Sequence, residues 1–293
     1  LLPETLRTFE SSDCVHVDLM NAGRLDDPFL DDNEIAAAWV GRADWTYGRD
    51  LAWTGPECDR VDLVFEGLDT VARIEIDGVA IAFTRNMHRS YRFDVSDRLS
   101  GALRVHFTSA YTEAERVQAE LGPRPNAYPE PFQFVRKMAA SFGWDWGPTL
   151  VTAGIWRPVR LEGWSTARLA SVRPLATAGH LDLRLDVERT RDRDLTAEIT
   201  LGGAVLGVVA IPAGTTTAAF AADVDAEPWQ PGDPALHALT VVLRDGDDVL
   251  DRWERRTGFR TVEIDQRGGA FVFPLNASPV LIKGVNCIPD DIF

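Results

Sequence analysis

One heptapeptide brings together side chains that are suited to binding a polar ligand: Phe142-Gly143-Trp144-Asp145-Trp146-Gly147-Pro148. The glycines tolerate backbone angles that other residues resist, and Pro148 fixes its own φ, so the stretch predicts a tight, rigid turn. Indole faces cover the apolar C–H patches of a sugar ring, and a carboxylate accepts charge-assisted hydrogen bonds from neighbouring hydroxyls. Sugar binding is therefore one interpretation. In the other, the tryptophans fill the edge of a domain and Asp145 caps the turn.

The composition excludes several classes of function. The chain has 293 residues, of which 45% are hydrophobic and 26% charged, as expected for about two globular domains. No stretch approaches the roughly 20 apolar residues that a membrane-spanning helix needs. The formal net charge of −15 argues against a nucleic-acid surface, which requires clustered Lys and Arg, and suits a neutral ligand.

Neither a metal nor a cofactor is expected. The five histidines form no HxxxH or HExxH pair, and the chain has no glycine-rich phosphate loop. The three cysteines, Cys14, Cys58 and Cys287, lie far apart and are predicted to be free thiols in a reducing compartment, so the predicted location is the cytoplasm. The chain begins at Leu1 and stops at Phe293 just after an apolar run, and both ends are expected to be cut.

The elements before the turn read mainly as short β-strands. Trp45 and Tyr47 alternate on one face of an expected strand, where core packing is favoured over ligand contact. A clear period of two begins near residue 60, and Asp77-Gly78 indicates a hairpin. This pattern is typical of an antiparallel sandwich or jelly roll. Strands are predicted at 61–66, 71–76, 79–83, 91–95, 103–107 and 154–161, and short helices at 15–23, 34–39 and 112–122.

After Trp164 the composition shifts to Ala, Thr, Val and Leu. Residues 165–262 alternate cleanly, for example at 181–187 and 195–201, with the length and rhythm of an immunoglobulin-like sandwich. No site chemistry is visible there, and a packing role is expected. Residues 262–276 resemble a hairpin, and Pro279–Asn286 is predicted to be one continuous apolar strand of the kind that parallel sheets cover on both faces.

Taken together, these motifs resemble the β-mannosidases of glycoside hydrolase family 2. The likeness rests on the tryptophan turn and on segments that follow in the same order over almost the whole chain. They are Asp26-Asp27-Pro28-Phe29, Asp32-Asn33-Glu34, Asp44-Trp45-Thr46-Tyr47, Phe65 to Thr70, Thr152 to Val159, and Lys283 to Asp291.

The resemblance implies a mainly β chain in three parts. These are a galactose-binding-like jelly-roll domain at 1–164, an immunoglobulin-like sandwich at 165–262, and the incomplete start of a TIM barrel at 263–293. It also implies exo-hydrolysis of terminal β-linked mannose with retention of configuration. The implied partner is a mannoside or manno-oligosaccharide, with no nucleic acid or membrane, and a homodimer of the complete enzyme is compatible with the family.

The resemblance also assigns site residues. Trp144 matches a wall of the terminal-sugar pocket, and Asp145 matches a carboxylate that accepts hydrogen bonds from the sugar hydroxyls. Arg136 and Lys137 match a basic pair nearby. Asn286 matches a residue at the end of the first barrel strand. Two departures stand out. Position 287, commonly aromatic, is a cysteine, and residues 10–13 lack the usual Pro-Gly.

No catalytic residue is expected in this chain. A retaining glycosidase needs two carboxylates about 5–5.5 Å apart, and the resemblance places both glutamates beyond Phe293. Asp290 and Asp291 are adjacent and are interpreted as loop and capping residues. The chain alone is therefore expected to be inactive. Two alternatives stay open: a non-catalytic carbohydrate-binding protein on the same scaffold, and another family 2 enzyme such as a β-galactosidase or glucuronidase, which fits the architecture but not the tryptophan turn.

Overall fold

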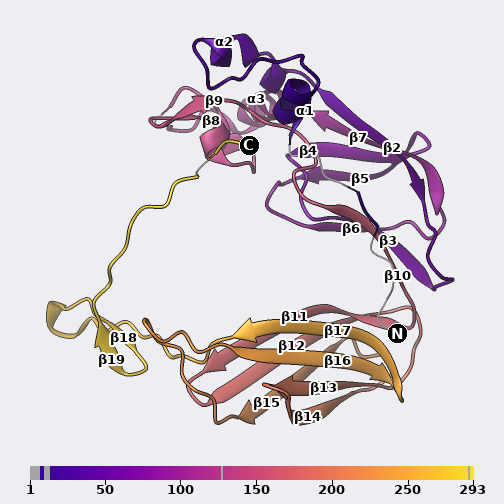
Figure 1. The fold of residues 1–293 in the computed structure, drawn as a ribbon, viewed down its shortest axis with the longest axis vertical. Coiled ribbons are helices and arrows are strands. Elements are labelled where there is room, and N and C mark those ends of the chain that lie inside the picture. The colour runs from indigo at the N-terminus through magenta and orange to yellow at the C-terminus, as the bar shows by residue number, and fades with distance from the viewer. Residues whose placement is uncertain (1–6, 10–13, 127, 290) are drawn as a thin grey trace. The chain divides into compact units, whose positions relative to one another are not determined.

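The computed structural model describes residues 7–9, 14–126, 128–289 and 291–293, which form two compact units (Figure 1). The first, here the jelly-roll unit, comprises the described residues within 5–56, 61–163 and 287–293. The second, here the sandwich unit, comprises 57–60 and 164–286. The chain is mainly β, as predicted from the period of two.

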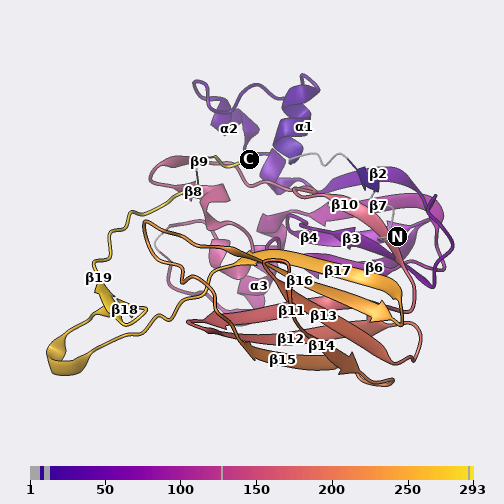
Figure 2. The same cartoon turned by 60° about the horizontal axis from the view of Figure 1, so that its bottom comes forward.

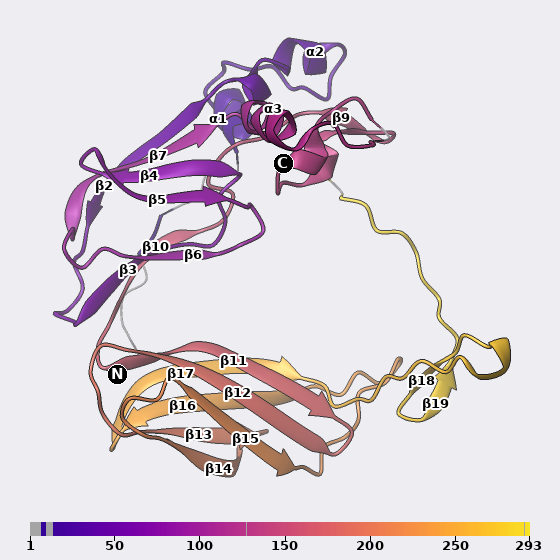
Figure 3. The ribbon, with the colours of Figure 1, turned by 180° about the vertical axis from the view of Figure 1, so that it is seen from behind.

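Two four-stranded antiparallel sheets build the jelly-roll unit (Figures 2 and 3). Alternate apolar residues of β7 (Ser100–Thr108) point inward, so that Leu103, Val105 and Phe107 are buried while their neighbours are partly exposed. One sheet has the order β1 (Arg7–Phe9), β10 (Val159–Trp164), β3 (Arg60–Phe65), β6 (Tyr91–Asp94). The other has the order β2 (Trp45–Ala52), β7 (Ser100–Thr108), β4 (Val71–Ile76), β5 (Val79–Arg85).

Short helices and one small hairpin surround one end of these sheets (Figure 3). The predicted helices are present, and α3 (Ala110–Leu121) ends where Gly122 adopts a positive φ of 77°. None of the helices among the described residues is long and apolar enough to cross a membrane. The helical elements are α1 (Val15–Asn21), α2 (Asn33–Ala37), η1 (Val40–Arg42), α3 (Ala110–Leu121), η2 (Phe132–Phe134) and η3 (Ala139–Ser141), and the hairpin is β8 (Phe142–Trp144) with β9 (Gly147–Thr149).

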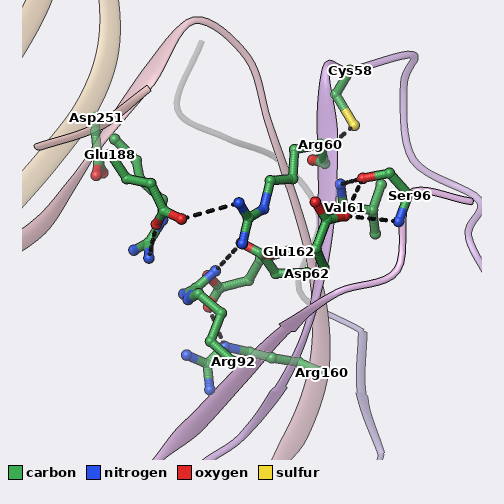
Figure 4. Close-up of polar contacts among 12 residues, drawn as sticks. Cys58, Arg60, Val61, Asp62, Arg92, Ser96, Arg160, Glu162, Glu188 and Asp251 are labelled. Atoms are coloured by element: carbon green, nitrogen blue, oxygen red, sulfur yellow. Dashed lines mark hydrogen bonds and ion pairs between the residues drawn. The ribbon is translucent and has the colours of Figure 1, made fainter. Parts of the chain in front are cut away.

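A charged network ties three strands of the first jelly-roll sheet together (Figure 4). Arg92 on β6 donates to the buried carboxylate of Asp62 on β3 at 2.9 Å and also pairs with Glu162 on β10. Arg160 donates to Glu162 at 2.5 Å and pairs with Glu66 at the same distance. Because Asp62 is fully buried, its negative charge needs this partner.

The sandwich unit packs a three-stranded sheet against a four-stranded one (Figure 1). Alternate residues of β12 (His180–Arg189) are buried in the core between the sheets, namely Leu181, Leu183, Leu185 and Val187. The sheets run β11 (Ala167–Thr177), β12 (His180–Arg189), β15 (Thr217–Asp223) and β14 (Ala204–Ile211), β13 (Leu195–Leu201), β16 (His237–Asp245), β17 (Asp248–Thr257).

Two predicted strands are shorter than expected. The strand expected from residue 154 begins only at Val159, after Pro158, which lacks the N–H that a strand needs for pairing. The apolar strand predicted at Pro279–Asn286 is reduced to β19 (Ser278–Val280), paired with β18 (Phe273–Leu275). Residues 281–289 are irregular, and Val285 is 93% exposed, because no described strand pairs with them. A barrel strand here stays a prediction.

Candidate functional site

The tryptophan turn is the tip of the β8–β9 hairpin. Phe142 pairs with Thr149 and Trp144 with Gly147, leaving Asp145 and Trp146 as the two turn residues. Gly143 has a φ of +85°, and a Cβ at this position would overlap the Thr149 hydroxyl. Only glycine therefore fits this point of the hairpin, and a tight turn forms as the glycine spacing predicts.

The turn exposes aromatic surface together with a carboxylate. Trp144 is 39% exposed and Trp146 is 36% exposed, and Asp145 between them is also exposed. The Trp144 ring is tilted against Tyr128, with centroids 5.0 Å apart, and against Phe132 at 6.2 Å. The preceding proline-rich loop thus buttresses Trp144, while part of its surface stays open to a ligand.

Apolar packing holds the base of the hairpin beside α3 (Figure 3). Phe142 is 2% exposed and meets the Tyr111 ring edge to face, with centroids 5.4 Å apart. Val151 joins the same cluster. Leu150, just after β9, packs in a second small cluster with Ala37 of α2. These contacts bury both ends of the hairpin and leave its tip free.

Helix α2 also holds the hairpin by a hydrogen bond. The Glu34 carboxylate accepts the Thr149 backbone N–H at 2.7 Å. Asn33 beside it donates its amide to the Asp27 carbonyl at 2.9 Å, and Asp27 accepts the Phe29 N–H at 2.9 Å as the predicted turn requires. The Asp26–Phe29 and Asp32–Glu34 motifs are therefore bonded to each other, and the second of them is bonded to strand β9 of the tryptophan turn.

The motif at residues 44–47 has the packing role favoured from its sequence. Trp45 donates its indole N–H to the Val40 carbonyl at 2.9 Å, and Tyr47 donates its hydroxyl to the Asp18 carboxylate at 2.6 Å. The Tyr47 ring meets Phe107 edge to face at 5.8 Å. These side chains join α1 and η1 to the sheet.

Arg136 and Lys137 are adjacent, yet their side chains lie in different environments. Lys137 is 5% exposed, and its ammonium pairs with the Asp69 carboxylate and donates to the Thr152 hydroxyl at 2.6 Å. Burial lowers the pKa of Lys137, and the Asp69 charge opposes that shift. Arg136 is exposed and lines a groove of about 750 Å³ together with Arg85. Substrate contact by either residue stays a prediction.

Asn286 is the last residue of the sandwich unit and is exposed in the irregular segment. Cys287, the next residue, is also exposed and belongs to the jelly-roll unit. The predicted contact of Asn286 with a sugar is untested. Asp291 accepts the backbone N–H groups of Ile292, at 2.6 Å, and Phe293, at 3.1 Å, which is the expected capping role. Asp290 lies outside the described residues.

Sequence reasoning missed three residues near the hairpin. His16 is 1% exposed, and its ring stacks on Phe293 with centroids 5.4 Å apart. Among the described residues, neither of its ring nitrogens has a hydrogen-bond partner. Ile292 packs against Leu150. The apolar character of residues 292–293 was visible in the sequence, but their partners lie far away along the chain.

This geometry defines an exposed Trp-Asp-Trp turn on a β scaffold of two units, and the comparisons identify the family. Residues 4–157 match the galactose-binding domain-like model of the glycosyl hydrolases 2, and residues 169–260 match the model of the glycosyl hydrolases family 2. The chain belongs to glycoside hydrolase family 2.

The individual relatives narrow the comparison from the family to β-mannosidases. β-Mannosidase B of Emericella nidulans is 32% identical over 94% of this chain, and β-mannosidase of Mus musculus is 29% identical over 95% of it. The chain spans only 36% of the length of each relative. Among solved structures, a β-D-mannosidase from Dictyoglomus thermophilum matches 100% of this chain and 40% of its own, with a TM-score of 0.83 and 29% identity. An exo-chitosanase from Amycolatopsis orientalis, at 20% identity and a TM-score of 0.68, covers 95% of this chain and 33% of its own, and it shares the fold.

Proposed function

We propose that this chain forms part of an exo-acting, retaining β-mannosidase, to which it supplies two accessory domains and one wall of the pocket for the terminal sugar. The observation that carries the proposal is the exposed Trp144-Asp145-Trp146 tip on a hairpin whose base is buried. The β-mannosidases among its relatives supply the sugar class.

The wall would act through two kinds of contact. Trp144 would cover the apolar face of the sugar, and the Asp145 carboxylate would accept hydrogen bonds from its hydroxyls. Mannose differs from glucose by one axial hydroxyl, and a site that bonds to hydroxyls can discriminate on that basis. We propose Arg136 and Asn286 as further contacts, on the family resemblance alone.

The reaction itself would use residues outside this chain. Retention requires a nucleophilic carboxylate and an acid/base carboxylate about 5–5.5 Å apart. We propose that both are glutamates of a barrel that continues after Phe293, so that this chain alone is inactive. The strand predicted at Pro279–Asn286 would then pair with barrel neighbours, which would cover apolar side chains such as Leu281, now 82% exposed.

Nitrophenol release from aryl β-mannoside, β-glucoside and β-galactoside tests the proposal, with this chain and with a longer chain that continues through the downstream reading frame. We expect hydrolysis of the mannoside by the longer chain only. Hydrolysis of the galactoside in preference would favour another family 2 glycosidase. Activity in neither chain, together with mannoside binding, would favour a carbohydrate-binding protein. Activity of this chain alone would contradict the placement of the catalytic carboxylates.

A further inference from the structure

Three buried polar side chains meet where the segment bearing the turn begins and ends. Lys137 lies just before residues 138–151 and Thr152 just after them, and the Lys137 ammonium donates to the Thr152 hydroxyl at 2.6 Å. The Thr152 hydroxyl donates to Oδ2 of Asp69 at 2.6 Å, and Lys137 pairs with the same oxygen. The three residues are 5%, 6% and 2% exposed, respectively.

Asp69 is itself fixed to the chain that leaves the hairpin. Its backbone N–H donates to the Gly154 carbonyl at 2.9 Å, and the Gly154 N–H donates back at 2.8 Å. The carboxylate that holds Lys137 is therefore carried by backbone that is pinned two residues beyond Thr152. This arrangement closes residues 138–151 into a loop with a rigid base.

We propose that Asp69, Lys137 and Thr152 form a clamp, here called the base clamp, that sets the position of the Trp144–Asp145 tip. Lys137 and Thr152 are then positioning residues for sugar binding, an assignment that rests on the proposed function of the turn. The family resemblance places Lys137 near the sugar pocket. In the base clamp, Lys137 acts on the pocket by holding Thr152 and not by contact with the sugar.

The chemistry of the clamp suits positioning better than stability alone. Desolvation of two charges offsets most of their attraction, and apolar residues of similar volume often stabilise a core equally well. A buried ion pair with a bridging hydroxyl, in contrast, has one satisfied geometry and penalises all others. It therefore fixes the spacing between the two ends of the loop.

Hydrogen exchange of individual backbone amides tests the clamp without reference to any sugar. Thr152→Val removes the bridging hydroxyl at nearly constant volume, and Thr152→Ser keeps it. Thr70→Val is the matched control, because the Thr70 hydroxyl donates to the other oxygen of the same Asp69 carboxylate and lies outside the loop. If Thr152→Val does not fold, Thr152→Ala takes its place.

We expect the backbone amides of residues 143–147 and 149 to exchange at least ten times faster in Thr152→Val, while β4 and β7 keep their rates. Thr152→Ser and Thr70→Val should match the wild type in the hairpin. Unchanged exchange in the hairpin, or equal acceleration in β4 and β7, would overturn the clamp.

The longer chain separates this inference from the proposed function. If the clamp positions the sugar wall, KM for an aryl β-mannoside rises several-fold in Thr152→Val and recovers in Thr152→Ser. Faster hairpin exchange with an unchanged KM would refute the positioning role. Faster exchange in a longer chain whose wild type hydrolyses no mannoside would refute the proposed function and leave the clamp intact.

Discussion

Replacing Lys137 with methionine should destabilise the jelly-roll unit strongly. The Lys137 side chain is 0% exposed and the Asp69 side chain 3% exposed, so the substitution leaves a carboxylate buried without its counter-charge. Breaking a buried pair by removing one partner costs about 3–5 kcal/mol. That is a large part of the roughly 5–15 kcal/mol by which domains are stable.

Thermal unfolding followed by tryptophan fluorescence measures this loss. The signal reports mainly on the jelly-roll unit, which contains six of the nine tryptophans. A loss of this size lowers Tm by about 6–20 °C for a unit of this length. The control is Lys283→Met, which removes the only other lysine, an exposed one.

A double variant separates the cost of the unpaired Asp69 charge from the cost of the lost Lys137 packing. Asp69→Asn added to Lys137→Met removes the unpaired charge, so Tm should recover in part. The reasoning is refuted if Lys137→Met unfolds within about 1 °C of the wild type, or if Lys283→Met causes an equal loss.

Three further predictions concern groups around the turn. Burial, with a smaller effect from the Lys137 charge, lowers the pKa of His16 to about 4. Between about pH 6.5 and pH 4 the unfolded chain therefore binds a proton at His16 that the folded chain does not bind. Stability should fall by about 3 kcal/mol from pH 6.5 to 4 in urea titrations, and His16→Phe should flatten this slope; an identical slope in the variant would contradict the assignment. Gly78→Ala should lower the free energy of unfolding by about 1–2 kcal/mol through backbone strain alone. Gly143→Ala should lower it further, because only the new Cβ at position 143 meets a neighbouring side chain, and equal losses of Tm would speak against that overlap. Trp144→Ala should raise KM for an aryl β-mannoside about tenfold in the longer chain, whereas Trp39→Ala, which removes a 50% exposed indole of the same unit, should leave KM unchanged.

The alternation of apolar residues predicted most of the strands. β4 and β13 occupy the predicted residues 71–76 and 195–201, because one face of each is buried and the pattern is strong. It did not mark β11, which contains Pro174 and an irregular register, or β17, which is rich in charged residues. Those strands are set by their partners in the sheet.

The site was predictable only in part. The glycines and tryptophans of the turn are local signals, and a tight turn with an exposed tip forms where they predicted one. The support for it is not local. Glu34 binds Thr149 across 115 positions, and Lys137 meets Asp69 across 68, and no periodicity encodes such pairings. Arg136 and Lys137 therefore looked like one basic pair in the sequence, although the fold exposes the first side chain and buries the second.

The most direct test of the central claim compares two aspartates in the longer chain. Asp145→Ala removes the carboxylate of the tryptophan turn, and Asp247→Ala removes an exposed aspartate from the turn between β16 and β17. Two lost charge-assisted hydrogen bonds of about 1.5 kcal/mol each predict a fall of about 100-fold in kcat/KM for an aryl β-mannoside with Asp145→Ala, and none with Asp247→Ala. Wild-type kcat/KM in Asp145→Ala would contradict the claim that this turn binds the terminal sugar.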